Sequence, residues 1–452
     1  FLRYAVPVHG SDFLIASAIQ SLQTFQIPGN ADDNETQADT FANLQYHHAG
    51  RANGALVYGV AFKRSRIRDF NDPVNDLADG AYTLFSDRTS RDVLLNLDAS
   101  VTGPRHALKY GASYDASTVQ KLYSVTVEPE SVYPVAPATV VDNAPNAAHT
   151  QAAYVQDSWA MGHDWRLDYG LRADAYELFS TQFVRGFSQV SPRLKITRIY
   201  GTRASAYVYA GRFFTPFSFE NVSPSAAQEL NSQLQPTIAQ FDLKPQRDTD
   251  VEIGGILPVG AGQLGLRVMQ KAAVDLIDDT QVGDTALHQD INYARGNISS
   301  QSALYQQTFR HDGRLYVSLT HTRSVNKGCE TQLLAPCFGA PQDWTPADHD
   351  QKWDGAAGMS LTDAHSGWWS FDAEYGSGLS SAYCEPANDD CKVPPHTTFD
   401  VERGIGLNHG LTLTAGVYNV LNDRYLITYL NAQGNHYAAG RTFRVGLRFG
   451  ER

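Results

Sequence analysis

The sequence of 452 residues lacks long hydrophobic runs and any excess of basic charge. No stretch approaches the roughly 18 consecutive apolar residues of a membrane-spanning helix. Lys and Arg total 36 against 48 Asp and Glu, so the net charge is −12 and a nucleic-acid partner is not expected. Charged residues make up only 19% of the chain and hydrophobic residues 42%, which excludes a disordered chain or a coiled coil. A soluble protein fits this hydropathy, but so does a membrane β-barrel, whose strands alternate apolar with polar residues.

Catalytic motifs are also missing. The chain has no G-x-S-x-G, H-E-x-x-H or phosphate-binding P-loop sequence. One G-x-G-x-x-G match spans residues 260–265, but it lies at a tight turn between two strand-like runs with no helix after it. The 14 His are scattered, and His47 and His48 are expected on opposite faces of one strand. The sequence therefore predicts no enzyme, no cofactor and no metal site.

Cysteine is rare, and its four copies form two close pairs in stretches rich in Pro, Gly, Asn and Asp. A zinc site would require C-x2-C spacing or nearby His ligands, which these stretches do not have. Disulfides in an oxidising compartment are favoured over a metal site or free thiols. The expected pairs are Cys329 with Cys337 and Cys384 with Cys391.

The abundant signal is strict alternation of apolar and polar residues. In RDVLLNLDASV, residues 91–101, Val93, Leu95 and Leu97 share one face while Asn96 and Asp98 share the other. Residues 165–174 and 442–449 follow the same rule. Each run predicts a β-strand with one apolar and one polar face.

About nineteen such runs follow one another, joined by connections that alternate between short and mostly long. Residues 69–90 are expected to be one of the long connections, and the last run is expected to begin near Tyr437. This order is typical of a transmembrane antiparallel β-barrel with short periplasmic turns and long extracellular loops. A β-propeller would show a repeat of about 40 to 45 residues. Sandwich domains would show shorter strands and linkers. Neither pattern is present, so residues 1–452 are expected to form one all-β barrel domain.

Several segments carry distinctive motifs in a fixed order. The run AAYVQDSWAMGHDWRLDYGLRADAYELF, residues 152–179, joins a Tyr-x-Gln-Asp strand to a Gly-Leu-Arg-x-Asp strand. The next hairpin, residues 190–221, contains a Ser-Pro-Arg strand and an aromatic exit into a long loop. LKPQRDTDVEIGG follows, and residues 412–449 contain an Asn-x-Leu-Asn-x-x-Tyr stretch before the last strand. In their order and spacing these segments resemble the barrel of TonB-dependent outer-membrane receptors. The resemblance is good over about 152–449 and looser over the first 130 residues.

The resemblance implies a barrel of about 22 strands closed by an N-terminal plug domain. About three strands and the plug are then expected ahead of Phe1, in a Gram-negative outer membrane. It implies active import of a scarce small ligand, such as a siderophore, cobalamin or a saccharide, powered by the TonB complex. A passive porin-like or plugless barrel and a surface binding or scaffold barrel remain alternatives. The ligand itself cannot be identified from the sequence.

The alternation also assigns side chains to faces. Outward aromatic residues are predicted to meet lipid or its interface: Trp165, Tyr169, Trp369, Phe371, Tyr375, Phe443 and Phe449. Inward charged residues are candidates for lining the lumen, with a solvated ladder of ion pairs as the simpler interpretation: Arg166, Asp168, Arg172, Asp174, Arg444 and Arg448.

A connection after one of these strands is rich in aromatic residues. GRFFTPFSFEN carries Phe213, Phe214, Phe217 and Phe219, which could stack on a ring-bearing ligand or pack the loop itself. The acidic tracts NADDNE and EPANDDC are interpreted as solvated loops rather than cation sites, because they do not have the spacing of a calcium loop.

Overall fold

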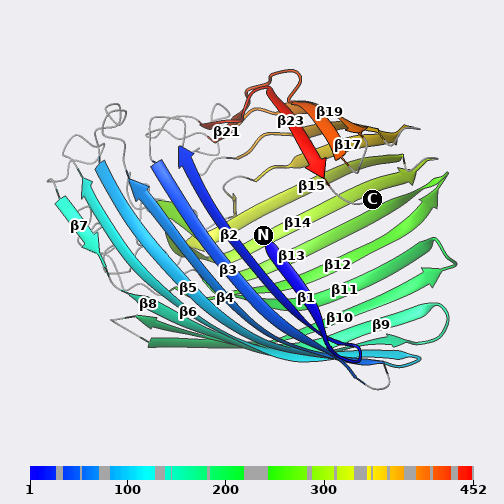
Figure 1. Ribbon diagram of the computed structural model, residues 1–452, viewed down its shortest axis with the longest axis horizontal. Coiled ribbons are helices and arrows are strands. Elements are labelled where there is room, and N and C mark those ends of the chain that lie inside the picture. Colours follow the sequence, from blue (N-terminus) through cyan, green and yellow to red (C-terminus); the bar gives the residue numbers. More distant parts are fainter. Residues whose placement is uncertain are drawn as a thin grey trace.

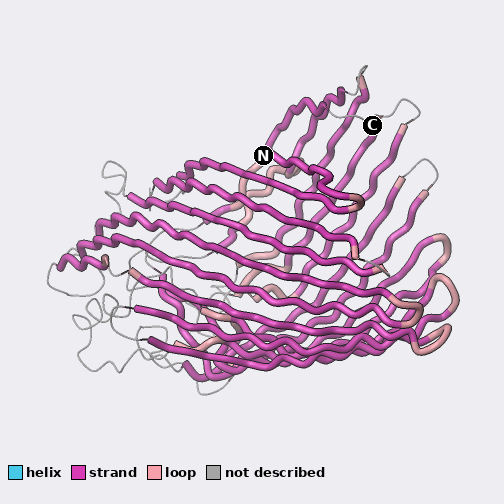
Figure 2. Tube along the Cα trace, turned by 60° about the horizontal axis from the view of Figure 1, so that its bottom comes forward, coloured by secondary structure: helices cyan, strands magenta, loops and turns pink. Residues whose placement is uncertain are grey.

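The computed structural model describes residues 1–26, 34–50, 53–70, 82–127, 138–143, 145–180, 184–217, 243–281, 288–309, 313–329, 344–347, 350–363, 367–380, 393–407, 411–428 and 436–449. Within these ranges the regular structure is β-strand (Figures 1 and 2). The described part of the chain contains no helix long and apolar enough to cross a membrane.

Nineteen of the described strands form the wall, as the alternation predicted. In chain order they are β1 (Leu2–His9), β2 (Asp12–Gln26), β3 (Asn34–Ala49), β4 (Gly54–Phe70), β5 (Tyr82–Thr102), β6 (His106–Val127), β8 (Asn146–Ala160), β9 (Trp165–Ser180), β10 (Val184–Tyr200), β11 (Ala204–Thr215), β12 (Gln246–Val259), β13 (Gly262–Gln281), β14 (His288–Thr308), β15 (Arg314–Cys329), β17 (Trp353–Thr362), β18 (Trp368–Gly376), β19 (His396–Gly406), β20 (Leu411–Tyr418) and β23 (Thr442–Phe449). Four short strands accompany them: β7 (Ala138–Asp142), β16 (Thr345–Pro346), β21 (Leu426–Thr428) and β22 (His436–Tyr437).

Each wall strand pairs antiparallel with the next wall strand along the chain. The resulting sheet curls into the wall of an incomplete barrel (Figures 1 and 2). Among the described residues, β1 pairs only with β2, and β23 pairs only with β20. The architecture is therefore a meander of hairpins, in which neighbours in sequence are neighbours in space.

The tight turns between β1 and β2, β3 and β4, β10 and β11, and β12 and β13 lie at one end of the wall. Each of these four turns contains a residue with a left-handed backbone: Gly10 (φ 58°), Asn53 (φ 59°), Gly201 (φ 62°) and Gly260 (φ 57°). Glycine and asparagine adopt this conformation at small cost, and it matches the twist of tight hairpins. At the other end most connections are longer, with the exception of residues 181–183 between β9 and β10.

Several strands are longer than the sequence predicted. Residues 69–90 were expected to be a connection, but β4 continues to Phe70 and β5 begins at Tyr82. Within residues 69–90, the parts that belong to β4 and β5 carry mostly polar side chains, so the alternation of apolar residues stops there. The backbone pairing between β4 and β5 nevertheless continues. The final strand was expected near Tyr437 and instead begins at Thr442, after the small β21–β22 hairpin. With β6 at 22 residues, the sheet extends well beyond the roughly 9 to 11 residues that cross a membrane.

The two faces of the sheet differ as the alternation predicted. Large apolar side chains stay exposed along one face, which a membrane barrel turns toward lipid. The seven predicted outward aromatic residues are all exposed, from 39% for Phe371 to 80% for Phe449. We call this the outer face and the opposite, more polar face the inner face.

Two carboxylates interrupt the outer face near the short turns, a feature that the sequence did not predict. Asp157 Oδ2 lies 2.6 Å from His106 Nδ1 and accepts a hydrogen bond from the Tyr169 hydroxyl at 3.1 Å. Asp12 Oδ2 lies 2.8 Å from His48 Nδ1 and accepts a hydrogen bond from Tyr46 at 2.6 Å. The Oδ2 of each carboxylate is thus supplied with donors beside the apolar surface, whereas Asp157 Oδ1 has no hydrogen-bond partner among the described residues.

Candidate functional site

The inner face of strands β10 to β13 carries a regular pattern of charged and aromatic side chains. Pairing places Lys195 of β10 opposite Tyr209 of β11, and Tyr209 opposite Glu252 of β12. The inner side chains are basic on β10, aromatic on β11, acidic on β12 and basic on β13: Arg193 and Lys195, then Tyr207, Tyr209 and Phe213, then Asp248, Asp250 and Glu252, then Arg267 and Lys271.

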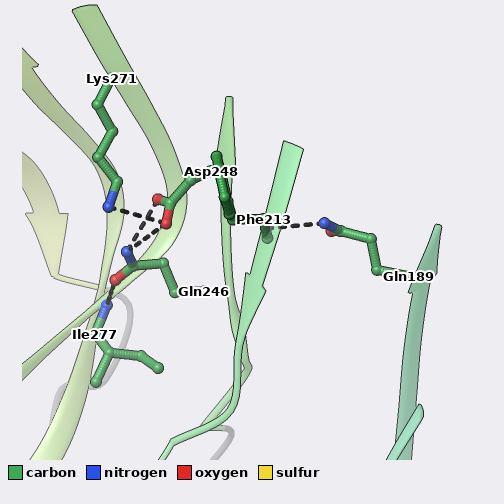
Figure 3. Close-up of polar contacts among 6 residues, drawn as sticks. All are labelled: Gln189, Phe213, Gln246, Asp248, Lys271 and Ile277. Carbon is green, nitrogen blue, oxygen red and sulfur yellow. Dashed lines mark hydrogen bonds and ion pairs between the residues drawn. The ribbon is translucent and has the colours of Figure 1, made fainter. Parts of the chain in front are cut away.

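Asp248 is the buried centre of this pattern, with only 2% of its surface exposed. Lys271 Nζ lies 3.1 Å from its Oδ2. The Gln246 side-chain amide donates to both carboxylate oxygens, at 2.9 and 3.0 Å (Figure 3). Gln246 is itself held by the Ile277 N–H, which donates to its Oε1 at 2.9 Å. The buried charge is therefore both paired and hydrogen-bonded, as its desolvation requires.

Aromatic rings separate the acids of β12 from the bases of β10. The Tyr207 hydroxyl donates to Glu252 Oε1, and Lys195 Nζ lies 4.0 Å from the centre of the Tyr207 ring. The Arg193 guanidinium lies 4.5 Å from the centre of the Phe213 ring. Both cations thus rest on aromatic faces, where the ring quadrupole attracts them.

Glycine makes room for one of these rings. A Cβ at Gly254 would lie 2.6 Å from the Tyr207 hydroxyl oxygen and 2.7 Å from its Cζ. Since real Cβ atoms do not approach so closely, the ring occupies the space that a side chain would need. Gly254 therefore positions the hydroxyl of Tyr207 for its contact with Glu252.

Two buried oxygens in this region have no hydrogen-bond partner among the described residues. Gln189 Nε2 donates a hydrogen bond to the Phe213 carbonyl at 2.8 Å (Figure 3). It also donates to Ser191 Oγ at 3.0 Å, while Gln189 Oε1 has no partner. Asp250 Oδ1 is unmatched as well. Buried acceptors of this kind are uncommon, so the wall offers two positions for a donor.

A hollow of about 800 Å³ adjoins the wall at β6 and β8 to β11. Its lining includes five basic side chains: Lys109, Arg166, Arg172, Arg193 and Lys195. Arg166 and Arg172 are paired with carboxylates, whereas the other three have no ion pair within the described residues. The hollow is thus suited to an anionic group.

An apolar cluster lies beside the charged and aromatic pattern, toward the end of the wall with the longer connections. Tyr176, Leu178 and Ala148 of the inner face pack with Phe217 and Leu243. The Tyr176 and Phe217 rings meet edge to face at 5.4 Å, and the Tyr176 hydroxyl donates to the Phe217 carbonyl at 3.4 Å. Phe217 and Leu243 flank residues 218–242, so both ends of that connection are packed against the wall.

The charged residues predicted on β9 lie on the inner face as two ion pairs. Arg166 Nε donates to Asp168 at 2.9 Å, and Arg172 Nε donates to Asp174 at 2.8 Å. Each pair joins residues two apart on the same strand, which is the ladder arrangement that the sequence left as the simpler interpretation. Arg444 lies over the Tyr418 ring at 4.6 Å, and Arg448 is paired with Thr412 in the β20–β23 ladder.

The predicted loop aromatics divide between the two features. Phe213 is part of the charged and aromatic pattern, whereas Phe214 and Phe217 pack in the apolar cluster. Phe219 lies outside the described residues, as do the side chains of Cys329, Cys337, Cys384 and Cys391 and the acidic residues of EPANDDC. No group of His, Cys, Asp and Glu in the described ranges could hold a metal ion.

Sequence reasoning did not single out Asp248, Gln246, Lys271 or Tyr207. One signal was present: in QRDTDVEIGG the acids Asp248, Asp250 and Glu252 recur with period two. That period assigns them to one face, but it does not identify Lys271 or Tyr207 as their partners.

The family of the chain follows from comparison with known proteins. Residues 3–420 match the model of the family described as TonB dependent receptor-like, beta-barrel, and the chain belongs to this family. It is a family of receptors and transporters rather than enzymes, found in Gram-negative outer membranes. A comparison with curated proteins gave no match.

Solved structures share the fold at low sequence identity. The ferric-catecholate import receptor Fiu of E. coli K12 is 12% identical with a TM-score of 0.71, covering 98% of this chain and 72% of that one. The ferric yersiniabactin uptake receptor FyuA of Yersinia pestis is 13% identical with a TM-score of 0.72, covering 97% and 67%. The FrpB iron transporter of Neisseria meningitidis is 14% identical with a TM-score of 0.70, covering 98% and 69%.

Proposed function

We propose that this chain is the barrel of an active outer-membrane importer powered by TonB, and that it takes up a small anionic ligand. The family assignment supports the transport class. The observation that carries the ligand class is the hollow, where Lys109, Arg193 and Lys195 have no carboxylate partner among the described residues. A ligand with anionic groups would pair with these side chains.

Uptake by intact cells tests the transport class. Cells producing the complete protein would be offered a panel of labelled ligands, including a ferric tris-catecholate, ferric citrate, cobalamin and an uncharged oligosaccharide. Uptake should stop when a protonophore collapses the proton-motive force or when TonB is deleted. Uptake that continues under both conditions, or a large steady conductance in planar bilayers, would contradict active import and favour a passive pore.

Binding by the purified protein tests the ligand class separately. Replacing all three basic residues, in K109Q/R193Q/K195Q, should weaken binding of an anionic ligand from this panel by at least about tenfold. The control, R267Q, removes an inner-face cation that lies beside Glu252 and does not line the hollow, and it should change binding much less. Equal affinity in the triple variant and the parent would show that the hollow does not select the ligand, whatever drives transport.

A further inference from the structure

On the outer face of strands β2 to β6, an entirely apolar row of paired residues is followed by an entirely polar row. The apolar row consists of directly opposed residues on the five strands: Ala18, Ala42, Phe62, Val93 and Ala116. The next row on the same face is entirely polar: Gln20, Thr40, Arg64, Arg91 and Thr118. The polar row lies toward the end of the wall with the longer connections, since β4 runs from a short turn at Asn53 to the connection after Phe70 (Figure 1).

Beyond the apolar row the outer face of β4 and β5 carries four arginines, Arg64, Arg66, Arg68 and Arg91, which we call the arginine patch. One carboxylate is shared among them. Asp87 accepts two hydrogen bonds from Arg66, at 2.9 and 2.6 Å, and lies 3.5 Å from Arg68 Nε. Arg64 and Arg91 are exposed, and neither has an ion pair or hydrogen bond within the described residues. The patch therefore carries a net positive charge.

Arg64 and Arg91 are directly opposite each other in the β4–β5 ladder. Opposed residues in an antiparallel pair have Cβ atoms about 4.5 to 5.5 Å apart, and like charges at that distance destabilise the sheet. Folding alone does not explain why two arginines are opposed here. The neighbouring positions of the same row, Thr40 and Thr118, show that an uncharged residue fits the sheet at this level. An anion between the two guanidinium groups removes the repulsion, and phosphate matches the planar fork of arginine.

We infer that the arginine patch binds the phosphorylated headgroup of a lipid in the leaflet on the side of the longer connections. A lipid is favoured over a free anion because the patch borders the apolar surface directly. Phe62 and Val93, in the row next to Arg64 and Arg91, are 38% and 42% exposed and supply a surface for acyl chains. In a Gram-negative outer membrane this leaflet consists of lipopolysaccharide, whose lipid A carries phosphate groups. The inference rests on the membrane placement of the barrel and is independent of what it transports.

Native mass spectrometry of the complete protein tests this site. The protein would be purified in detergent and mixed with lipid A that carries both phosphates, or with the same lipid after enzymatic dephosphorylation. The parent should retain the phosphorylated form. R64Q/R91Q should retain about 25-fold less, because each basic residue near an anionic surface contributes roughly a factor of five. R64K/R91K should fall between them, since lysine keeps the charge but not the bidentate geometry.

Two arginines at the opposite end of the wall provide a control for the loss of positive charge. Arg198 is an outer-face residue beside Trp165, and Arg105 lies in a short turn, so R105Q/R198Q removes the same charge from the other rim. This variant should retain lipid A as the parent does. The inference would be overturned if R64Q/R91Q retained as much phosphorylated lipid A as the parent. It would also be overturned if the parent retained the dephosphorylated lipid as well as the phosphorylated one. A band shift on heating in SDS gels confirms that every variant is folded. If added inorganic phosphate displaces the lipid completely, the patch is a site for the free anion instead.

Discussion

Lys271 Nζ lies 3.1 Å from Oδ2 of Asp248, a carboxylate that is only 2% exposed. The two residues come from adjacent strands, β13 and β12, and are not directly opposite, since Asp248 is paired with Ala273. The contact is therefore a diagonal one across the ladder, within reach of a long side chain.

Removing the cation should destabilise the barrel. Lys271→Ala leaves Asp248 with Gln246 as its remaining donor, and we expect a loss of about 2 kcal/mol in the free energy of unfolding because a buried carboxylate loses its counter-charge. Urea titration of the detergent-solubilised protein measures this. Lys109→Ala, which removes an inner-face lysine without an ion pair in the described residues, should change the midpoint little. Equal midpoints for the two variants would contradict the role of the pair.

Gly254 should not tolerate a methyl group. Gly254→Ala places a Cβ where the Tyr207 ring lies, displaces the ring and breaks its hydrogen bond to Glu252, with a cost of about 1 kcal/mol. Gly265 is the matched control, because an added Cβ there would meet only the Leu304 carbonyl oxygen at 3.7 Å. Thermal unfolding of both variants should lower the midpoint for Gly254→Ala alone; a similar shift for Gly265→Ala would show a general cost of alanine in these strands.

The apolar cluster should be the most sensitive part of the inner face. Phe217 is 4% exposed and contacts Tyr176 and Phe187, so Phe217→Ala should cost about 3 kcal/mol through lost contacts and the cavity left behind. Val190→Ala is a control on the outer face, where the side chain is 57% exposed. The denaturation midpoint should fall for Phe217→Ala and change little for Val190→Ala. A small effect of Phe217→Ala would mean that the residues flanking 218–242 are not held by this packing.

The outer-face carboxylate Asp157 provides a test of buried hydrogen bonding. Tyr169→Phe removes one of its donors while keeping the ring, and should cost about 1 kcal/mol. Tyr110→Phe is the matched change, since Tyr110 is an outer-face tyrosine, 45% exposed, without a hydrogen bond in the described residues. Unfolding in detergent or in reconstituted bilayers should separate the two variants, and indistinguishable stabilities would show that the Tyr169 hydroxyl contributes nothing to Asp157.

The cysteine pairs remain a prediction. Non-reducing peptide mass spectrometry should recover Cys329 joined to Cys337 and Cys384 joined to Cys391 in protein taken from the outer membrane. Each pair encloses a short segment, as expected for local disulfides in an oxidising compartment. Alkylation of these thiols without prior reduction would contradict the pairing.

The sequence predicted the fold more completely than the site. Alternation in runs such as 91–101 and 165–174 is a local property, and it was sufficient to count the wall strands and assign Trp165 and Trp369 to the outer face. It failed where the alternation of apolar residues stops, so the polar ends of β4 and β5 were interpreted as a connection. The ladder of β4 and β5 continues there because backbone hydrogen bonds do not depend on apolar side chains.

The sequence by itself determined that this protein is a meander of two-faced strands with tight turns at one end, because period and turn chemistry are written in neighbouring residues. The tertiary structure decided which side chains meet across strands: Asp248 with Lys271, Tyr207 with Glu252, and Arg64 opposite Arg91. Those relationships depend on the register between strands, and a shift of one residue would move every partner to the other face. Register is set by the assembled sheet as a whole, which is why it could not be derived from any single strand.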